Sequence, residues 1–235
     1  MVALDVANTD EALKLIEKIG PGVDFYKIGM ELYAAGGMDF VGQVSGLGKQ
    51  VFLDLKLYDI GETVKRATRK ICDSGAVTFL TVHGSRAIMK AAVEGRGDTK
   101  TKLLAVTVLT SFDQDDLADL GYPAQVTELV ELRVRKAVES GIDGIVCSPL
   151  EIARVRKIGG PELKLVIPGV RSSGSSVGDQ KRVATPAEAM RDGADYLVIG
   201  RQVTRATDPA AACNQILEEI AKERETQKAS RVFVS

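Results

Sequence analysis

The 235-residue chain is predicted to fold as a single α/β domain, a (β/α)8 TIM barrel. Short apolar runs rich in β-branched residues alternate with amphipathic helical patterns, and this alternation repeats eight times along the chain. No linker or low-complexity segment interrupts it, and a doubly wound sheet would usually have fewer strands and a clearer glycine-rich first turn. We therefore expect the barrel over residues 1–225, followed by a tail of residues 226–235 that lacks a clear pattern and is expected to be disordered.

The expected elements follow one another in strand–helix order. Proline and glycine mark several helix ends: Pro186 and Pro209 each follow a capping residue, and Gly75, Gly141 and Gly193 stand where helices should stop. Strands are predicted over residues 2–6, 24–28, 50–57, 79–83, 103–109, 144–148, 164–168 and 196–200. Helices are predicted near residues 10–19, 38–47, 63–74, 87–95, 126–140, 150–158, 186–192 and 209–224.

Composition excludes several functional classes. The formal net charge is −1 and the basic residues are spread out, so nothing indicates a nucleic-acid or anionic-membrane partner. The chain has no apolar run of about 18 residues and no signal-peptide pattern. Cys72, Cys147 and Cys213 are too far apart for a zinc site and odd in number for a disulfide framework. We expect a soluble protein of the reducing cytoplasm.

The third predicted strand ends in an unusual concentration of charge. Asp54 and Lys56 interrupt an otherwise apolar run two residues apart, so both side chains should point to the same side, and Asp59 follows in the turn. Burying a charge costs several kcal/mol unless it is paired, so these residues indicate either a functional site or a structural ion pair at a strand end.

Other strand ends also carry polar residues, where a barrel places its chemistry. Lys27 ends the second strand, and it is either a surface lysine or a member of the Asp54–Lys56 cluster. Lys56, set between two carboxylates, is expected to remain an ammonium, which suits proton donation to a developing carbanion. The remaining ends carry Asp5, His83, Thr110, Ser111, Ser148, Arg171, Gly200 and Arg201.

The last strand and the loop before it indicate a phosphate site. Gly200 would let a backbone N–H approach a phosphate, and Arg201 can hold its oxygens in a bidentate fork. The Gly- and Ser-rich stretch 168–180 is either a mobile surface loop or a lid, with Arg171 and Gln180 as contacts from its two ends.

His83, Thr110 and Ser111 are open to more than one interpretation. His83 ends the fourth strand and could act as a base or serve a packing role. No second histidine or acidic pair accompanies it at metal-ligand spacing, so we expect no histidine-based metal site. Thr110 and Ser111 could contact the polar edge of a ligand or cap the loop that follows.

Together these motifs resemble the orotidine 5'-monophosphate decarboxylases. The similarity covers nearly the whole chain in order, and the most specific part is Lys27 followed by Asp54-x-Lys56-x-x-Asp59. The resemblance implies a metal-free and cofactor-free decarboxylase that forms UMP and is active as a dimer with sites at the subunit interface. The other matching segments are 2–5, 26–29, 106–111, 168–171, 179–180 and 199–201.

The resemblance also implies a role for each matching residue. Lys56 would protonate C6 of the pyrimidine, Asp54 would face the departing carboxylate, and Lys27 would hold the charge network and the ribose. Asp59 would reach into the partner subunit's site. The other implied contacts are Ile60 and Thr63 near Asp59, Asp5 at the ribose, Thr110 and Ser111 by the pyrimidine, Arg171 at the lid root, and Gln180, Gly200 and Arg201 at the phosphate.

One departure and two alternatives accompany this interpretation. The family commonly has proline after the Asp-Ile pair, whereas this chain has Gly61 and Glu62, which could alter the turn that carries Asp59. A magnesium-dependent sugar-phosphate decarboxylase or aldolase of the same superfamily shares the Asp-x-Lys-x-x-Asp pattern. Such relatives have a glutamate where this chain has Lys27, whose charge would repel the cation. A non-catalytic barrel that binds a phosphate ligand is the second alternative.

Overall fold

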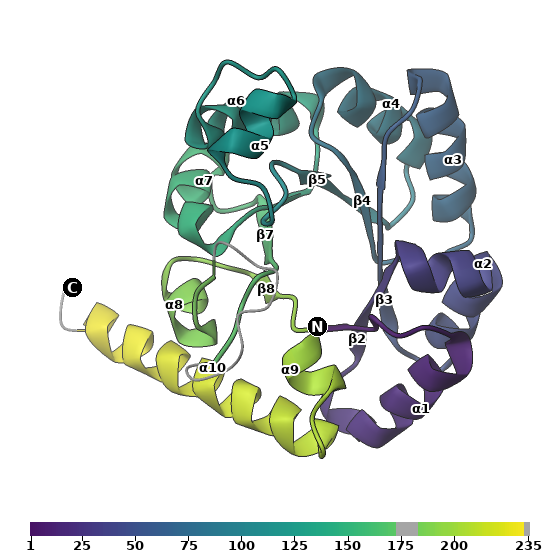
Figure 1. Cartoon of the computed structure of the whole chain (residues 1–235), viewed down its shortest axis with the longest axis vertical. Coiled ribbons are helices and arrows are strands. Elements are labelled where there is room, and N and C mark those ends of the chain that lie inside the picture. Colours follow the sequence, from purple (N-terminus) through teal and green to yellow (C-terminus); the bar gives the residue numbers. More distant parts are fainter. Residues whose placement is uncertain (173–182, 233–235) are drawn as a thin grey trace.

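The eight parallel strands of the computed structural model, which describes residues 1–172 and 183–232, form one sheet in the order β1 to β8 (Figure 1). A parallel bridge between Val2 and Ile199 joins the last strand to the first, and the Ala3 N–H donates to the Ile199 carbonyl at 2.8 Å. The predicted barrel class is therefore confirmed. The strands are β1 (Val2–Ala3), β2 (Phe25–Gly29), β3 (Gln50–Leu57), β4 (Phe79–His83), β5 (Lys102–Val106), β6 (Gly144–Val146), β7 (Lys164–Ile167) and β8 (Tyr196–Leu197).

Helices surround this ring of strands, and three of them differ from the prediction (Figure 1). Helix α2 begins at Met30 rather than near residue 38, because it continues across a kink at Gly37, where φ is +56°. The short helices α5 and α9 were not predicted. The helices are α1 (Thr9–Ile19), α2 (Met30–Gly46), α3 (Gly61–Asp73), α4 (Arg86–Arg96), α5 (Gln114–Asp119), α6 (Val126–Ser140), α7 (Ile152–Gly159), α8 (Pro186–Arg191), α9 (Arg201–Thr204) and α10 (Pro209–Val232), with 3₁₀ turns at Gly20–Gly22 and Pro149–Glu151.

Five strands, β1, β5, β6, β7 and β8, end earlier than the sequence pattern predicted, and three of them end three residues earlier. The sheet ladder stops at Ala3, Val106 and Leu197, although apolar residues continue beyond each of these positions. The residues that follow, such as Val108 and Gly200, line a cavity at the carboxyl ends of the strands. The apolar pattern therefore continues past the sheet because it also builds the wall of this cavity.

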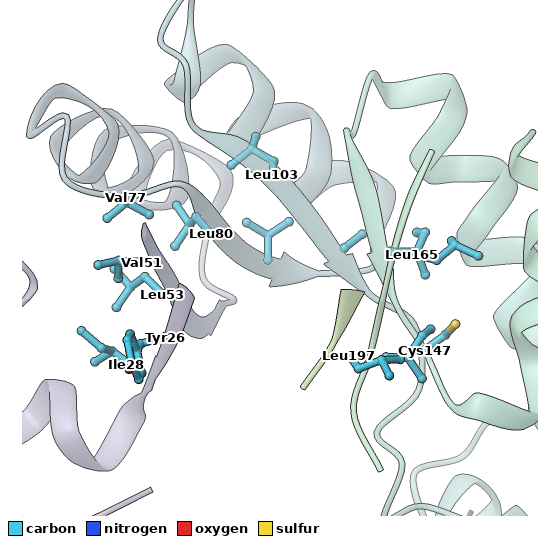
Figure 2. Close-up of a cluster of buried hydrophobic side chains, with 14 of the residues drawn as sticks. Tyr26, Ile28, Val51, Leu53, Val77, Leu80, Leu103, Cys147, Leu165 and Leu197 are labelled. Carbon is cyan, nitrogen blue, oxygen red and sulfur yellow. The ribbon is translucent and has the colours of Figure 1, made fainter. Parts of the chain in front are cut away.

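Side chains alternate between the inside of the barrel and the layer beneath the helices. The aromatic rings of Phe25, Phe79 and Tyr196 meet inside it, with centroids 5.1 Å apart for Phe25–Phe79 and for Phe79–Tyr196. Alternate residues such as Tyr26 and Ile28 pack outward, and Figure 2 shows part of this outer cluster. In each strand, the residue two positions after an inward-facing residue also faces the inside of the barrel.

Two arginine–aspartate clips tie helix ends to strand starts at the amino end of the barrel. Arg96, at the end of α4, pairs with Asp143, whose carboxylate also accepts from the Leu103 N–H at 2.8 Å. In α7, Arg156 pairs with Asp195 at 2.6 Å, and Asp195 accepts from the Leu165 N–H at 2.8 Å. The same pattern of contacts thus connects α4, β5 and the start of β6, and again α7, β7 and the start of β8.

The last helix crosses the boundary expected between barrel and tail. Helix α10 runs to Val232, so residues 226–232 are helical, and residues 233–235 lie outside the described residues. The division at residue 225 stays a prediction. Within the described ranges, no helix combines the length and apolar character needed to cross a membrane.

Candidate active site at the carboxyl ends of the strands

A cavity of about 490 Å³ opens at the carboxyl ends of the strands. Its floor contains barrel residues such as Ala3, Phe52 and Val198, and charged or polar residues stand above them. Alternation places Lys27 two positions after Phe25 and Asp54 two positions after Phe52, on the inner face. Nine predicted site residues line the cavity: Asp5, Lys27, Asp54, Lys56, Thr110, Ser111, Arg171, Gly200 and Arg201.

An alternating chain of carboxylates and ammonium groups crosses one side of the cavity. The Lys27 Nζ lies 2.9 Å from Asp5 Oδ1 and 3.9 Å from Asp54 Oδ2. The Lys56 Nζ lies 2.9 Å from Asp54 Oδ1. The Asp54 side chain is 15% exposed and that of Lys27 is 12% exposed, whereas Lys56 retains 35%. The Lys56 ammonium is thus paired from behind and still accessible from the cavity.

The backbone of β3 is irregular where it carries Lys56. Leu53 pairs with Leu80 and Leu57 pairs with Val82, so three residues of β3 face one residue of β4. Within this bulge Lys56 has φ of +50°, the one positive φ of a non-glycine residue in the described part of the chain. Such a conformation is uncommon for a side chain of this size and persists when surrounding contacts hold it.

Gly29 leaves room for the Lys27 ammonium. A Cβ at Gly29 would lie 3.1 Å from Lys27 Nζ and 3.8 Å from Asp5 Oδ1. The absence of a side chain at this position therefore lets the ammonium stay between the two carboxylates. Within this strand, Lys27 thus supplies an ammonium to the cavity, and Gly29 leaves the space that the ammonium occupies.

Guanidinium groups gather on another part of the cavity wall. Arg171, Arg201 and Arg205 all line it. Burial and the positive charge of Arg201 lower the pKa of Arg171 below its ordinary value. An anion bound beside Arg171 would stabilise its charged guanidinium. Arg205 was missed as a site residue, although it follows Arg201 by four positions and the one-turn spacing of a helix was the available signal.

The segment after Arg171 is tied to the helices that follow the barrel. The Ser172 N–H donates to Gln202 Oε1 at 3.1 Å, and the Ser172 hydroxyl donates to Glu219 Oε2 at 2.9 Å. These bonds connect the chain beyond β7 to α9 and α10. Gln180, predicted as a phosphate contact, lies outside the described residues.

Asp59, Ile60 and Thr63 are not brought to this cavity. Asp59 and Ile60 are exposed, and Asp59 Oδ1 accepts from the Ile60 N–H at 2.6 Å. Ile60 is 77% exposed, and it precedes α3, which starts at Gly61. A site composed of one chain alone therefore contains six of the predicted charged residues without Asp59: Asp5, Lys27, Asp54, Lys56, Arg171 and Arg201.

His83 lies beside the site rather than in it. Its ring is 4.3 Å from the Tyr58 ring, centroid to centroid, and both line a smaller adjacent cavity of about 220 Å³. Burial, with the nearby charge of Arg133, lowers the pKa of His83 to about 4. The imidazole is consequently neutral at pH 7. A pKa this low makes the imidazole a weak base, which favours the packing role over that of a catalytic base.

Two carboxylates of the cavity, Asp5 and Asp54, are paired with lysines rather than grouped as metal ligands. The carboxylates of Asp5 and Asp54 each lie within 4 Å of at least one lysine ammonium. Across residues 1–172 and 183–232, no group of three or more His, Cys, Asp or Glu side chains could hold a metal ion. This set of donors suits an anionic ligand or a reacting carbanion better than a divalent cation.

The fold and this cavity define a (β/α)8 barrel protein with a charged site at the carboxyl ends of its strands. Comparison with known proteins gives the family. Residues 1–216 match the model of the Orotidine 5'-phosphate decarboxylase / HUMPS family, and the chain belongs to that family.

Similar proteins cover nearly the whole chain. An orotidine 5'-phosphate decarboxylase of Rhodopseudomonas palustris (strain BisA53) is 54% identical over 220 residues, which is 94% of this chain and 93% of that protein. One from Nitrobacter winogradskyi is 50% identical over 221 residues, covering 94% of this chain and 92% of the relative. The crystal structure of the Lactobacillus acidophilus orotidine 5'-phosphate decarboxylase matches with a TM-score of 0.82 at 35% identity, over 93% of this chain and 97% of that one.

Proposed function

We propose that this protein decarboxylates orotidine 5'-monophosphate to UMP, the last step of de novo pyrimidine nucleotide synthesis. One observation carries the proposal: the Lys56 ammonium is held 2.9 Å from Asp54 and remains accessible from a cavity that also contains guanidinium groups. The relatives at 50–54% identity have this activity in their names, and their similarity extends over 94% of the chain.

Lys56 is the proposed proton donor. Loss of carbon dioxide breaks the bond between C6 and the carboxylate, and the electron pair stays on C6 of the pyrimidine. An ammonium beside C6 stabilises this charge and then transfers a proton to it. Lys56 becomes a neutral amine in this step and regains a proton from solvent before the next turnover. Its partial exposure supports that exchange.

Asp54 and Lys27 support Lys56 from behind. The Asp54 carboxylate pairs with the Lys56 ammonium at 2.9 Å, and it would face the substrate carboxylate before this group leaves. Lys27 lies between Asp5 and Asp54, so the network alternates in sign. We assign Asp5 and Lys27 to the ribose hydroxyls, and Thr110 and Ser111 to the pyrimidine, because all four line the same cavity.

The phosphate would bind at the guanidinium wall. Arg201, Arg171 and the backbone near Gly200 line the cavity, and Arg205 is added to the predicted set. Gln180 remains part of this proposal from its sequence position alone. A phosphate held far from C6 supplies binding energy that positions the pyrimidine over Lys56.

The two alternatives are less well supported. The family description covers more than the decarboxylase, so family membership alone does not choose between a nucleotide and a sugar phosphate. Lys27 decides against the magnesium-dependent reaction, because its ammonium occupies the space between Asp5 and Asp54 that a cation would need. A barrel that only binds a phosphate ligand would have no use for a cavity-facing ammonium paired from behind.

We further propose a homodimer in which Asp59, Ile60 and Thr63 contribute to the partner subunit's site. Asp59 and Ile60 project from the turn between β3 and α3 and are exposed in the single chain. Met30 and Tyr58, which lie close in sequence to cavity residues, are large apolar side chains that are 64% and 69% exposed in the single chain. A partner subunit would cover such side chains. We place the protein in the cytoplasm, a setting supported by three buried cysteines that are all free.

The proposal predicts turnover of orotidine 5'-monophosphate by the purified protein without added metal. Loss of the orotate absorbance measures the rate, and a chelator should leave it unchanged. The Lys56→Ala variant should lose about 4 kcal/mol or more of transition-state stabilisation, because nothing else in its place donates a proton to C6. Circular dichroism of this variant serves as the control for folding. A strict magnesium requirement, or turnover of a ketose phosphate instead, would overturn the assignment.

A further inference from the structure

Thr81 is a buried polar residue that contacts the reactive end of β3 without lining the cavity. It lies in the middle of β4 and is fully buried. Its hydroxyl oxygen accepts from the Lys56 N–H at 2.9 Å and lies 2.9 Å from Asp54 Oδ1, to which it donates. One side chain therefore contacts both members of the Asp54–Lys56 pair.

The bulge in β3 explains why a hydroxyl is needed here. Between the pairs Leu53–Leu80 and Leu57–Val82, β4 offers Thr81 alone opposite three residues of β3. The Lys56 N–H then finds its partner in the Thr81 side chain instead of in a strand carbonyl. A buried N–H that lost this partner would carry an unfavourable desolvation cost.

The polarity of the two hydrogen bonds is fixed by their partners. A backbone N–H can only donate, and an ionised carboxylate can only accept. The Thr81 hydroxyl has one proton, which it gives to Asp54, and a lone pair, which receives the Lys56 N–H. These two bonds use the single proton of the hydroxyl and one of its two lone pairs.

We propose that Thr81 is a positioning residue for the Asp54–Lys56 pair. Its bond to the backbone holds Lys56 at the positive φ of +50°, and its bond to Oδ1 fixes the rotation of the Asp54 carboxylate. The direction of the Lys56 ammonium follows from these two constraints. This inference rests on the proposed function, since the rate that it affects is that of decarboxylation.

The test compares Thr81→Val, which removes the hydroxyl, with Thr81→Ser, which keeps it. A small misplacement of a reacting group can cost a factor of roughly 100 in rate, and we expect that loss in kcat for Thr81→Val. The KM should change less than about 3-fold, because Thr81 does not touch the ligand cavity. Thr81→Ser should restore kcat to within about 5-fold of the unaltered protein.

Thr101→Val is the matched control. Thr101 is also a buried threonine, 4% exposed, and its hydroxyl donates to the Val77 carbonyl at 2.8 Å, away from the site. Its variant should lose thermal stability and keep kcat. If Thr101→Val loses kcat to the same extent, if Thr81→Val keeps kcat, or if Thr81→Ser is as impaired as Thr81→Val, the proposal is wrong.

Two further measurements cover the remaining outcomes. If Thr81→Val does not fold, Thr81→Cys replaces it, because a thiol is a weak donor and acceptor; equal kcat for the Ser and Cys variants would overturn the proposal. A crystal structure of the Val or Cys variant should show Lys56 away from φ of +50° or its ammonium further than 2.9 Å from Asp54. An unchanged geometry contradicts the positioning role, whether or not the unaltered protein turns over orotidine 5'-monophosphate.

Discussion

At the scale of single residues, Gly29 sets the place of the Lys27 ammonium. The ammonium lies 3.1 Å from the point where a Cβ of residue 29 would be, closer than side chains normally tolerate. Lys27 is flexible at its far end, so an added methyl group would move the ammonium rather than the backbone. The distances to Asp5 and Asp54 would change with it.

Gly29→Ala is expected to lower kcat/KM roughly 10-fold, because a displacement of a few tenths of an ångström weakens the alternating charge network. Steady-state kinetics with orotidine 5'-monophosphate measures the effect. Gly42→Ala is the control: this glycine lies within α2 and an added Cβ would meet nothing within 4 Å. It should keep full activity and gain about 0.5–1 kcal/mol of stability from helix propensity. Equal activities of the two variants would contradict the prediction.

Some residues of the site could be predicted from the sequence and others could not. Strand alternation predicted that Asp54 and Lys56 point to the same side, and the two side chains do meet at 2.9 Å, although a bulge interrupts the strand between them. Thr81 could not be assigned, because its contact depends on a bulge that no residue pattern in β3 reveals. Arg205 was missed for a different reason: its four-residue spacing from Arg201 is a signal only if a helix is expected there, and α9 is too short for apolar periodicity to predict one.

At the scale of elements, the two arginine–aspartate clips connect the second half of the barrel. Arg156 also donates to the carbonyls of Gly160, Leu163 and Gly193, at 2.9, 2.7 and 2.8 Å. Its guanidinium therefore gathers the end of α7, the start of β7 and the turn before β8. These contacts lie at the amino end of the strands, opposite the cavity, where residues contribute to stability rather than to catalysis.

Arg156→Met should reduce the free energy of unfolding by about 2 kcal/mol, because Asp195 and several carbonyls lose a charged donor. Urea unfolding measures this change, and kcat should remain that of the unaltered protein. Arg154→Met is the matched control on the same helix. Arg154 pairs with Glu131 at 2.9 Å but is 57% exposed, so its loss should change stability by less than about 0.5 kcal/mol. Similar losses in both variants would contradict the special role of the clip.

Helices were harder to predict than strands, for a physical reason. The helix predicted near residues 38–47 begins at Met30 in the structure and continues through a kink at Gly37, so its first half was missed. The capping box of Asp113 and Asp116 starts α5 within what read as a loop. The first half of α2 and the whole of α5 were missed because a kink and a capping box, rather than apolar periodicity, define them.

At the scale of the whole molecule, the exposed turn of Asp59 and Ile60 supports an assembly of two chains. The cavity of one chain contains Lys56 but not Asp59, whose carboxylate bonds its own neighbour at 2.6 Å. In a twofold dimer each chain can supply this turn to the other. The active unit would then require residues from both subunits.

Mixing two inactive variants tests this arrangement. Lys56→Ala and Asp59→Ala should each lose most activity as homodimers. After the two are unfolded and refolded together, mixed dimers contain one complete site, so about a quarter of the unaltered activity should return. Sedimentation of each variant shows whether dimers form. Full activity of Asp59→Ala alone, or no recovery in the mixture, would show that Asp59 acts within its own chain or not at all.

The closure between Val2 and Ile199 bears on how the barrel folds. Every other strand pairing joins elements that follow one another in sequence, in the order β1 to β8 within the described residues. The closing bridge joins residues nearly two hundred positions apart, so forming it has the largest entropic cost of loop closure in the sheet. Neighbouring strands can assemble step by step, whereas the ring is complete only when its ends meet. Because Asp5 and Gly200 stand directly beyond this seam, the cavity exists only in the fully closed molecule.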